Sequence, residues 1–235
     1  ATGVEPVAFV DYLAVEAPDE ATSEDIGEGL REGAKRAGVA LVGGETAVMP
    51  DVIKGLDIAG TCAGLAAKDA VFPGEAAAGD AIVGWPSSGI HSNGLTLARE
   101  AVTRDHEYTD PFPPNPDRTI AEELLEPTRI YSEVLGPLRD AETHAAAHVT
   151  GGGWTNLTRM GAFRYEITDP FDPQSVFEFV QTEGTVDDEE MHRTFNMGTG
   201  FVAALPEADA ESVAAASDDA RIIGRVEEGD ETVSV

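Results

Sequence analysis

Apolar and polar positions in the first 70 residues follow the patterns of strands beside one helix. The runs "PVAFVDYLAV" and "VALVGG" have the composition of strands, whereas the segment between them repeats with helical spacing. Thr22 or Ser23 is expected to cap this helix, and Gly38 to end it. We expect the order β-α-β-β, with strands at 6–15, 39–44 and 56–67 and a helix at 22–37.

A connection between two domains is indicated by "KDAVFPGEAAAGD" (68–80), which mixes proline, glycine and charge. We therefore expect an N-terminal domain at 1–70 and a C-terminal domain at 75–235, in which strand and helix patterns alternate as in an α/β fold. Strands are expected at 80–86, 143–149, 162–168 and 198–205, followed by a final strand pair. Helices are expected at 94–104, 119–125, 129–141, after Gly153, and at 175–182, 188–193 and 207–217, with a proline-rich loop at 109–117.

The charge of the chain limits the classes of partner that it can bind. Asp and Glu number 44 against 15 Lys and Arg, which gives a net charge of −29, and 42% of the residues are hydrophobic. Nucleic acid and anionic membranes are therefore poor partners. Because the acids are spread along the chain rather than gathered in a tail, we expect a halophilic source, where salt screens their mutual repulsion.

The single cysteine, Cys62, fits a reducing compartment, and its place in an apolar strand predicts a small buried residue. No apolar run approaches the roughly 18 residues of a membrane span, and no leader precedes the first strand. We expect a cytoplasmic protein. Because the sequence starts at Ala1 without a methionine, we also expect it to lack a native N-terminal part.

The stretch "GWPSSGIHSNGLTL" (84–97) joins a strand to a helix through a loop of small residues. It is no hydrolase elbow, because Trp85 and Pro86 stand where a glycine would have to precede Ser87 or Ser88. Ser92 or Asn93 is expected to cap the following helix. A loop that ends at a helix start predicts an anion site, although a plain connection remains an alternative.

A second strand, loop and helix follow at "HVTGGGWTNL" (148–157), where Thr150 precedes three glycines. Three glycines let the backbone approach a ligand closely, and a simple turn rarely needs all three. The spacing is not that of the dinucleotide fingerprint, since Asn156 stands where a glycine is required.

A third candidate site is "GGETAVMP" (43–50), where Glu45 follows two glycines at a strand end. Such a carboxylate can hold Mg²⁺ against substrate phosphates, but an exposed turn residue is the simpler interpretation. Asp11 is a weaker metal candidate. Arg129 and Arg193 are more often surface ion pairs than phosphate ligands, and His144 and His148 more often packed than ligating.

In order along the chain, "FVDYLA", "GGETAVMP", "SSGIHSNG", "LEPTRIY", "HVTGGGWTN" and "RTFNMGTGF" closely resemble the aminoimidazole ribonucleotide synthetases, also called phosphoribosylformylglycinamidine cyclo-ligases. Six motifs that agree in sequence and order make this resemblance specific. It implies a homodimer whose N-terminal domains pair into a β-barrel, each with a C-terminal α/β domain. It also implies ATP-dependent closure of formylglycinamidine ribonucleotide to aminoimidazole ribonucleotide, with Mg²⁺ on the triphosphate.

The resemblance also implies roles for individual residues. Glu45 and Thr46 would lie on the ATP side, with Glu45 and Asp11 as metal ligands, and His91 would handle a proton or orient the substrate. The ribonucleotide and its phosphate would contact the two glycine-containing loops and two asparagines, namely Ser87, Ser88, Gly89, Ser92, Asn93, Thr150, Gly151, Gly152, Gly153, Asn156 and Asn196.

One departure from the family opens an alternative. Members carry an Asp-Gly-x-Gly-Thr-Lys motif upstream of "FVDYLA" that serves the ATP and metal site, and these 235 residues do not contain it. We therefore expect a part of a longer enzyme. The alternatives are a ribonucleotide-binding homologue without turnover and another ATP-using member of the superfamily, although "SSGIHSNG" with "GGETAVMP" favours the cyclo-ligase.

Overall fold

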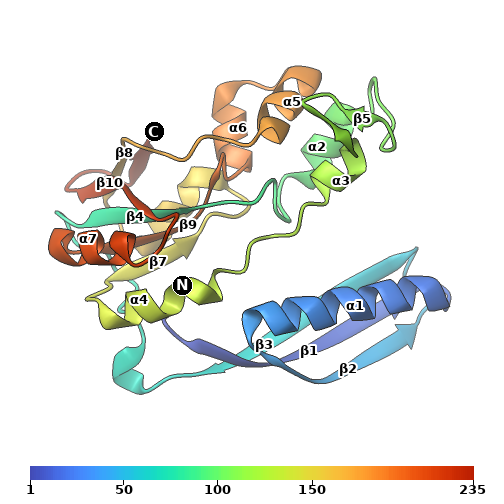
Figure 1. Cartoon of the computed structure of the whole chain (residues 1–235), viewed down its shortest axis with the longest axis horizontal. Coiled ribbons are helices and arrows are strands. Elements are labelled where there is room, and N and C mark those ends of the chain that lie inside the picture. The colour runs from blue at the N-terminus through green and yellow to red at the C-terminus, as the bar shows by residue number, and fades with distance from the viewer. The chain divides into compact units, whose positions relative to one another are not determined.

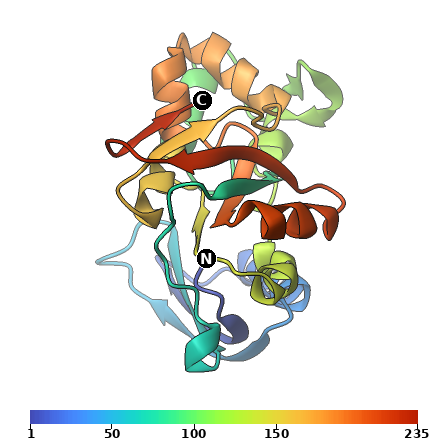
Figure 2. The same cartoon turned by 90° about the vertical axis from the view of Figure 1, so that its left-hand side faces the viewer.

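The computed structural model describes residues 1–235 and divides them into two compact units, Gly3–Val71 and Phe72–Val235, the latter including Ala1–Thr2. In Figures 1 and 2 the smaller unit runs from blue to cyan and the larger from green to red. The mixed fold of strands and helices expected from the sequence is confirmed.

The smaller unit is a three-stranded sheet with one helix. Strand β1 (Glu5–Val15) lies in the centre, parallel to β2 (Ala40–Val48) and antiparallel to β3 (Leu56–Leu65). Helix α1 (Glu20–Ala37) joins β1 to β2. Parallel neighbours need such a crossover, so the helix follows from the strand order.

Helix α1 begins two residues earlier than the sequence indicated. Its N-cap is Asp19, whose carboxylate accepts a hydrogen bond from the Thr22 amide at 2.7 Å, so neither Thr22 nor Ser23 is the cap. Gly38 ends the helix as expected, with a φ of 69° that glycine adopts without steric cost.

The sheet of the smaller unit leaves much apolar surface exposed in the single chain. Of the 15 large apolar side chains that are exposed, 11 belong to this unit: Val7, Val10, Tyr12, Leu41, Val42, Val48, Val52, Leu56, Ile58, Leu65 and Val71. Cys62 on β3 is also exposed, so the expectation of a buried thiol is wrong. A side chain on a sheet is buried only when another element covers its face, and every residue of β3 is exposed.

The larger unit is built on a six-stranded sheet in the order β11-β8-β10-β4-β9-β7, in which only β11 and β8 are parallel. Its strands are β4 (Ala81–Pro86), β7 (Ala145–His148), β8 (Arg164–Ile167), β9 (Thr199–Leu205), β10 (Arg221–Glu227) and β11 (Thr232–Ser234). The last two strands do not pair with each other, which corrects the expected final strand pair. Strand β11 instead adds to β8 at the edge.

Both faces of this sheet are covered, as the alternation along β4 shows. Ile82 packs into one apolar cluster with β8, β10 and the 3₁₀ helix η3 (Gly153–Met160). Val83 and Trp85 face the opposite cluster, against helices α4 (Leu135–Asp140) and α7 (Glu207–Ala215). The entire strand β9 is buried, because it lies between these two cores.

A third apolar cluster lies among helices beyond the sheet, α2 (Leu95–Val102), α3 (Ile120–Leu124), α5 (Ser175–Gly184) and α6 (Asp188–Thr194). Two short 3₁₀ helices are η1 (Lys68–Ala70) and η2 (Tyr131–Val134). The expected loop at 109–117 contains a small hairpin, β5 (Pro111–Phe112) with β6 (Asn115–Thr119), which buries Phe112. Asp187 caps α6, and its side chain accepts a hydrogen bond from the Glu190 amide.

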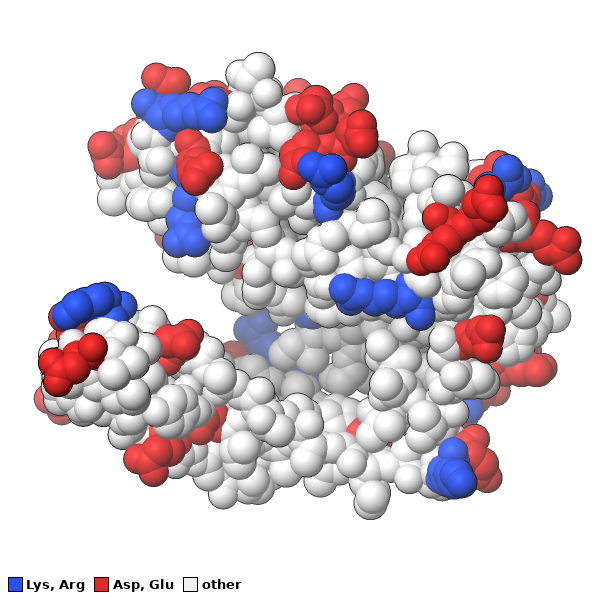
Figure 3. Space-filling model, turned by 180° about the vertical axis from the view of Figure 1, so that it is seen from behind, with Lys and Arg blue, Asp and Glu red and all other residues white.

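Acidic side chains are scattered over the face shown in Figure 3, interspersed with basic ones. The basic side chains do not gather into a single patch on this face. None of the helices combines the length and the apolar character that crossing a membrane would require.

Candidate functional site

The two glycine-containing loops singled out in the sequence lie side by side in the larger unit. The first connects β4 to α2, and the second connects β7 to η3. Asn93 lies against Gly151, where an added Cβ would meet the Asn93 Oδ1 at 3.0 Å. The fold thus brings together residues almost 60 positions apart, because β4 and β7 both flank β9 and end at neighbouring points of one sheet.

Several of the predicted substrate contacts are buried and hold the loops in place instead. Asn196 is 3% exposed, and its amide donates to the Gly89 carbonyl at 2.8 Å and accepts from the Gly198 amide at 3.0 Å. Ser87 donates its hydroxyl to Gln174 at 3.1 Å, and Gln174 donates back to the Ser87 carbonyl at 2.7 Å. These bonds fix the first loop on the entry to β9.

Asn156 does the same for the second loop. Its side chain is 2% exposed, donates to the Gly153 carbonyl at 2.7 Å and accepts from the Thr150 hydroxyl at 3.2 Å. Gly153 is required by geometry, since its φ is 51° and an added Cβ would lie 2.0 Å from the His192 carbonyl oxygen. Two amides therefore shape the loops, and their hydrogen-bonding groups already have partners.

Five other predicted residues of the loops are at least partly exposed. Ser92 and Gly151 are exposed, while Asn93, Thr150 and Gly152 are partly exposed. Neither Ser92 nor Asn93 caps α2, which corrects the expected N-cap. Gly94 takes that position with a φ of 71° and without a side-chain hydrogen bond. The first amides of α2 are thus left for solvent or a ligand, which suits an anion.

His91 is buried at 5% exposure, with a φ of 63° that is uncommon for a residue other than glycine. Its Nε2 accepts a hydrogen bond from the Ser88 amide at 3.1 Å. A backbone amide can only donate, so the neutral ring must carry its proton on Nδ1. Burial, and secondarily His148, lower the pKa of His91 from 6.5 to about 4, so the ring is neutral at pH 7.

Ser88 is not activated by this histidine. The Ser88 hydroxyl lies 3.2 Å from the His91 Nε2, but it donates its proton to the Pro127 carbonyl at 2.7 Å. It also accepts from the Arg129 amide at 3.1 Å. The pair is therefore a structural link between the loop and the segment 127–129, and the geometry agrees with the sequence in excluding a serine nucleophile.

Around His91 lies a cluster of buried rings. Tyr131 and His148 have ring centroids 6.3 and 6.1 Å from that of His91, and Tyr131 stacks on Phe201 at 5.3 Å. The Tyr131 hydroxyl donates to the Pro86 carbonyl at 2.9 Å. The Nδ1 of His91 and the Nε2 of His148 are buried without a partner, which is unusual for polar atoms in a core.

The sequence favours a surface ion pair for Arg129, and in the structure this residue has two acidic partners. Its guanidinium contacts Asp219 at 2.6 Å and Glu133 at 2.5 Å, and it lies 5.3 Å from the centroid of the Tyr131 ring. It also donates to the Pro86 carbonyl at 3.4 Å. This arginine holds the loop base and leaves little of its donor fork for a phosphate. Arg193 likewise pairs with Glu190.

Sequence reasoning missed Gln174, Thr128 and Asp219. Ser92 and Thr128 share a hydroxyl hydrogen bond of 3.2 Å, and Asp219 lies 90 residues from Arg129 in the chain. No local motif signals such long-range partners. Only the "EPTRIY" segment offered a hint, since it resembles a family motif.

Glu45, Thr46 and Asp11 lie in the smaller unit. Asp11 pairs with Gly44 across β1 and β2, whereas Glu45 pairs with Tyr12. Paired residues share a face of a sheet and successive residues alternate, so the Asp11 and Glu45 carboxylates point to opposite faces. No cluster of three His, Cys, Asp or Glu side chains suited to a metal occurs in the chain. A single ion held jointly by these two carboxylates does not fit this register.

Two family profiles match the chain. The AIR synthase related protein N-terminal domain matches residues 1–66, and the C-terminal domain of the same family matches residues 77–235. A phosphoribosylformylglycinamidine cyclo-ligase of Methanosarcina mazei is 50% identical over 97% of this chain and 69% of the relative. The phosphoribosylformylglycinamidine cyclo-ligase of Methanopyrus kandleri is 48% identical over 97% of this chain and 68% of the relative.

Solved structures share the fold at lower identity. A thiamine-monophosphate kinase from Stenotrophomonas maltophilia matches with a TM-score of 0.72 and 17% identity, covering 100% of this chain and 73% of that one. The hydrogenase maturation protein HypE in complex with ATP matches with a TM-score of 0.68 and 20% identity, covering 99% of this chain and 68% of that one.

Proposed function

Because the chain belongs to the AIR synthase related protein family, we propose that it catalyses the ATP-dependent closure of formylglycinamidine ribonucleotide to aminoimidazole ribonucleotide. The observation that carries this proposal is the 50% identity to a phosphoribosylformylglycinamidine cyclo-ligase over 97% of the chain. The six motifs on which the resemblance rests fall within that match. The reaction belongs to purine biosynthesis.

Chemically, ATP would supply the phosphoryl group that turns the formyl amide oxygen into a leaving group, with Mg²⁺ balancing its charge. The amidine nitrogen of the substrate then attacks the activated carbon, the ring closes and phosphate leaves. The protein's own contribution is to bring these atoms together and to stabilise developing charge, because both reacting groups belong to one substrate molecule.

The outer side of the two loops supports a binding role for the ribonucleotide phosphate. Uncapped amides at the start of α2 and the exposed backbone of Gly151 offer N–H donors to an anion. We propose Ser92, Asn93 and Thr150 as side-chain contacts, because all three are at least partly exposed and Asn93 lies against Gly151, next to Thr150. In this arrangement the buried members, among them Ser87, Asn156 and Asn196, hold the backbone in its binding shape.

We propose that His91 orients the loop rather than moving a proton. Its Nε2 already accepts from the Ser88 amide, and its low pKa keeps the ring neutral. Only 5% of its surface is exposed, so its side chain packs inside the larger unit. Its replacement by alanine is therefore expected to lower stability together with activity.

For the nucleotide side we retain Glu45 and Thr46 as proposed ATP contacts, with Glu45 as a Mg²⁺ ligand. Both are exposed on β2. Since Asp11 points to the opposite face of the sheet, it is not proposed as a second ligand to the same ion. We also propose that a second copy of the chain covers the exposed apolar side chains on strands β1, β2 and β3 of the smaller unit, as in a homodimer, and that the enzyme works in the cytoplasm.

The test is an assay of aminoimidazole ribonucleotide formation with ATP, on this chain and on a fusion that carries the upstream residues of the Methanosarcina mazei relative. Asn93→Ala should raise the KM for the ribonucleotide roughly tenfold, the effect of about 1.4 kcal/mol of lost binding. Asn115→Ala, on the β5–β6 hairpin, is the control and should leave KM unchanged. Ribonucleotide binding without product in the fusion would favour the homologue without turnover.

A further inference from the structure

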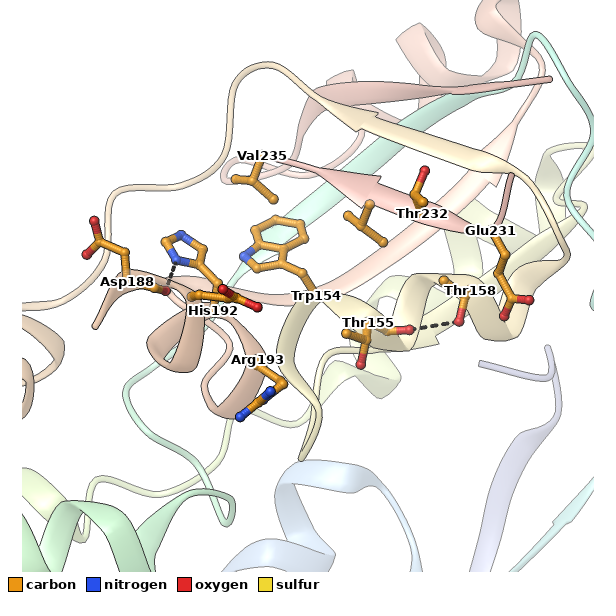
Figure 4. A pocket seen from close by; sticks show the side chains of 11 residues that line it. Trp154, Thr155, Thr158, Asp188, His192, Arg193, Glu231, Thr232 and Val235 are labelled. Carbon is orange, nitrogen blue, oxygen red and sulfur yellow. Dashed lines mark hydrogen bonds between the residues drawn. The ribbon is translucent and has the colours of Figure 1, made fainter. Parts of the chain in front are cut away.

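A separate cavity lies in the larger unit, between the 3₁₀ helix η3, helix α6 and strand β11. It has a volume of about 740 Å³, which lies within the range of small-molecule sites. Figure 4 shows its lining, with Trp154 in the middle, His192 on one side and the end of the chain above. None of its lining residues belongs to the proposed ribonucleotide contacts.

The cavity contains a hydrogen-bond donor without a partner. Trp154 is 3% exposed, and its indole Nε1 is buried and makes no hydrogen bond. Figure 4 shows this nitrogen on the edge of the indole that faces His192. Buried indole N–H groups usually have a partner, and a missing one costs about 1–3 kcal/mol. A ligand that displaces the atoms covering this nitrogen and places an acceptor there would remove this cost.

Apart from the Arg193 guanidinium, several polar groups of the cavity can accept a hydrogen bond. The His192 Nδ1 lies 2.8 Å from the Asp188 carbonyl oxygen, which can only accept, so the neutral ring leaves a lone pair on Nε2. The hydroxyls of Thr155 and Thr158 donate to the Gly152 and Thr155 carbonyls at 2.6 and 3.0 Å. Each hydroxyl proton is thus engaged, and each oxygen can still accept.

The charges at the cavity disfavour an anionic ligand. Three carboxylates line it, those of Asp188, Glu189 and Glu231, against the single guanidinium of Arg193. That guanidinium already pairs with Glu190. Apolar contact comes from the Trp154 ring, Val233 and Val235. The lining is therefore flat and apolar on one side, rich in acceptors, and negatively charged at its rim.

We propose that this cavity is a second small-molecule site, for an uncharged heteroaromatic ligand that presents an acceptor and an N–H donor on one edge. A primary amide or an aminopyrimidine has such an edge. The acceptor of the ligand takes the Trp154 N–H, and its amino group donates to the His192 Nε2 or to a neighbouring oxygen. The ring packs against the indole and the two valines.

The experiment follows the two indole N–H signals of the ¹⁵N-labelled chain by NMR, with nicotinamide as the probe. The chain has two tryptophans, and Trp85 is 0% exposed in another core, so its signal is an internal control. Trp154→Phe assigns the signals by removing one. The expected result is a saturating shift of the Trp154 signal while the Trp85 signal stays in place.

Two comparisons make the result specific. Nicotinate has the same ring but a carboxylate in place of the amide, so we expect it to bind at least tenfold more weakly. His192→Phe should weaken nicotinamide at least tenfold, whereas His106→Phe, which alters a histidine that pairs with Glu183, should not. No shift at millimolar nicotinamide, equal shifts of both tryptophans, or equal binding of nicotinate would each overturn the proposal.

Discussion

Replacing His91 with glutamine should remove one specific source of acid sensitivity from the larger unit. Glutamine can accept the Ser88 amide hydrogen bond through its side-chain oxygen, but it does not titrate. The native ring is buried, and its pKa falls from 6.5 to about 4, mainly because burial disfavours the charged form. The unfolded chain thus binds a proton at a higher pH than the folded one does.

The sign and size of the effect follow from this difference. Between pH 6.5 and about 4 the unfolded state holds more protons at His91, so stability falls as the pH falls through that window. From pH 7 to pH 5 the native histidine should lower the free energy of unfolding by about 2 kcal/mol relative to a group that does not titrate. Above pH 7 the contribution is nearly constant.

Urea unfolding at a series of pH values, at one fixed high KCl concentration, measures this difference. Both tryptophans lie in the same unit as His91, so their fluorescence reports on the relevant transition. Carboxylates titrate alike in both proteins and cancel in the comparison. The free energies of native and His91→Gln chains should diverge by about 2 kcal/mol between pH 7 and pH 5. Parallel curves would refute the assignment of a buried, neutral His91.

Three further changes test other parts of the structure. Gly153→Ala should destabilise the larger unit by more than about 2 kcal/mol in urea unfolding, because the added Cβ would clash with the His192 carbonyl. Gly136→Ala in α4 is the control, since its Cβ meets no atom within 4 Å, and it should not destabilise the unit to that extent. Raising KCl from 0.1 to 1 M should stabilise the chain, since screening shortens from ~10 to ~3 Å while the net charge is −29; a flat dependence argues against salt adaptation. Val42→Asp on β2 should lower the dimer fraction in sedimentation, and Val52→Asp, outside the strands and 70% exposed, should not; identical behaviour would contradict the proposed dimer.

Most elements of the fold could be predicted from the sequence, because their signals are local. The alternation along β1 and β4, the glycine after α1 and the acidic start of α6 each depend on a few neighbouring residues. The expectation for β11 was wrong for the opposite reason. Its partner is β8, nearly 70 positions earlier, and a three-residue strand carries no pattern that could identify it.

The candidate site could likewise be predicted only where its features depend on neighbouring residues in the sequence. Glycines at 151–153 are visible in the sequence, and Gly152 and Gly153 adopt positive φ values. Whether Asn156 and Asn196 face a ligand or the backbone depends on which carbonyls the fold brings near them. The burial of His91 could not be predicted from the sequence either, because the rings around it come from β7, β9 and η2.

The burial of His91 also limits what chemistry the larger unit can supply. With Nε2 engaged by the Ser88 amide and the ring neutral, no free base remains at the centre of the first loop. The Ser88 hydroxyl already donates a hydrogen bond to the Pro127 carbonyl, and Arg129 is held by Asp219 and Glu133. What the loops still offer to a ligand is a set of backbone amides and the side chains of Ser92, Asn93 and Thr150. Ring closure within one substrate needs orientation and charge stabilisation more than a strong base, and in the proposed site amides held rigidly by buried asparagines would provide both.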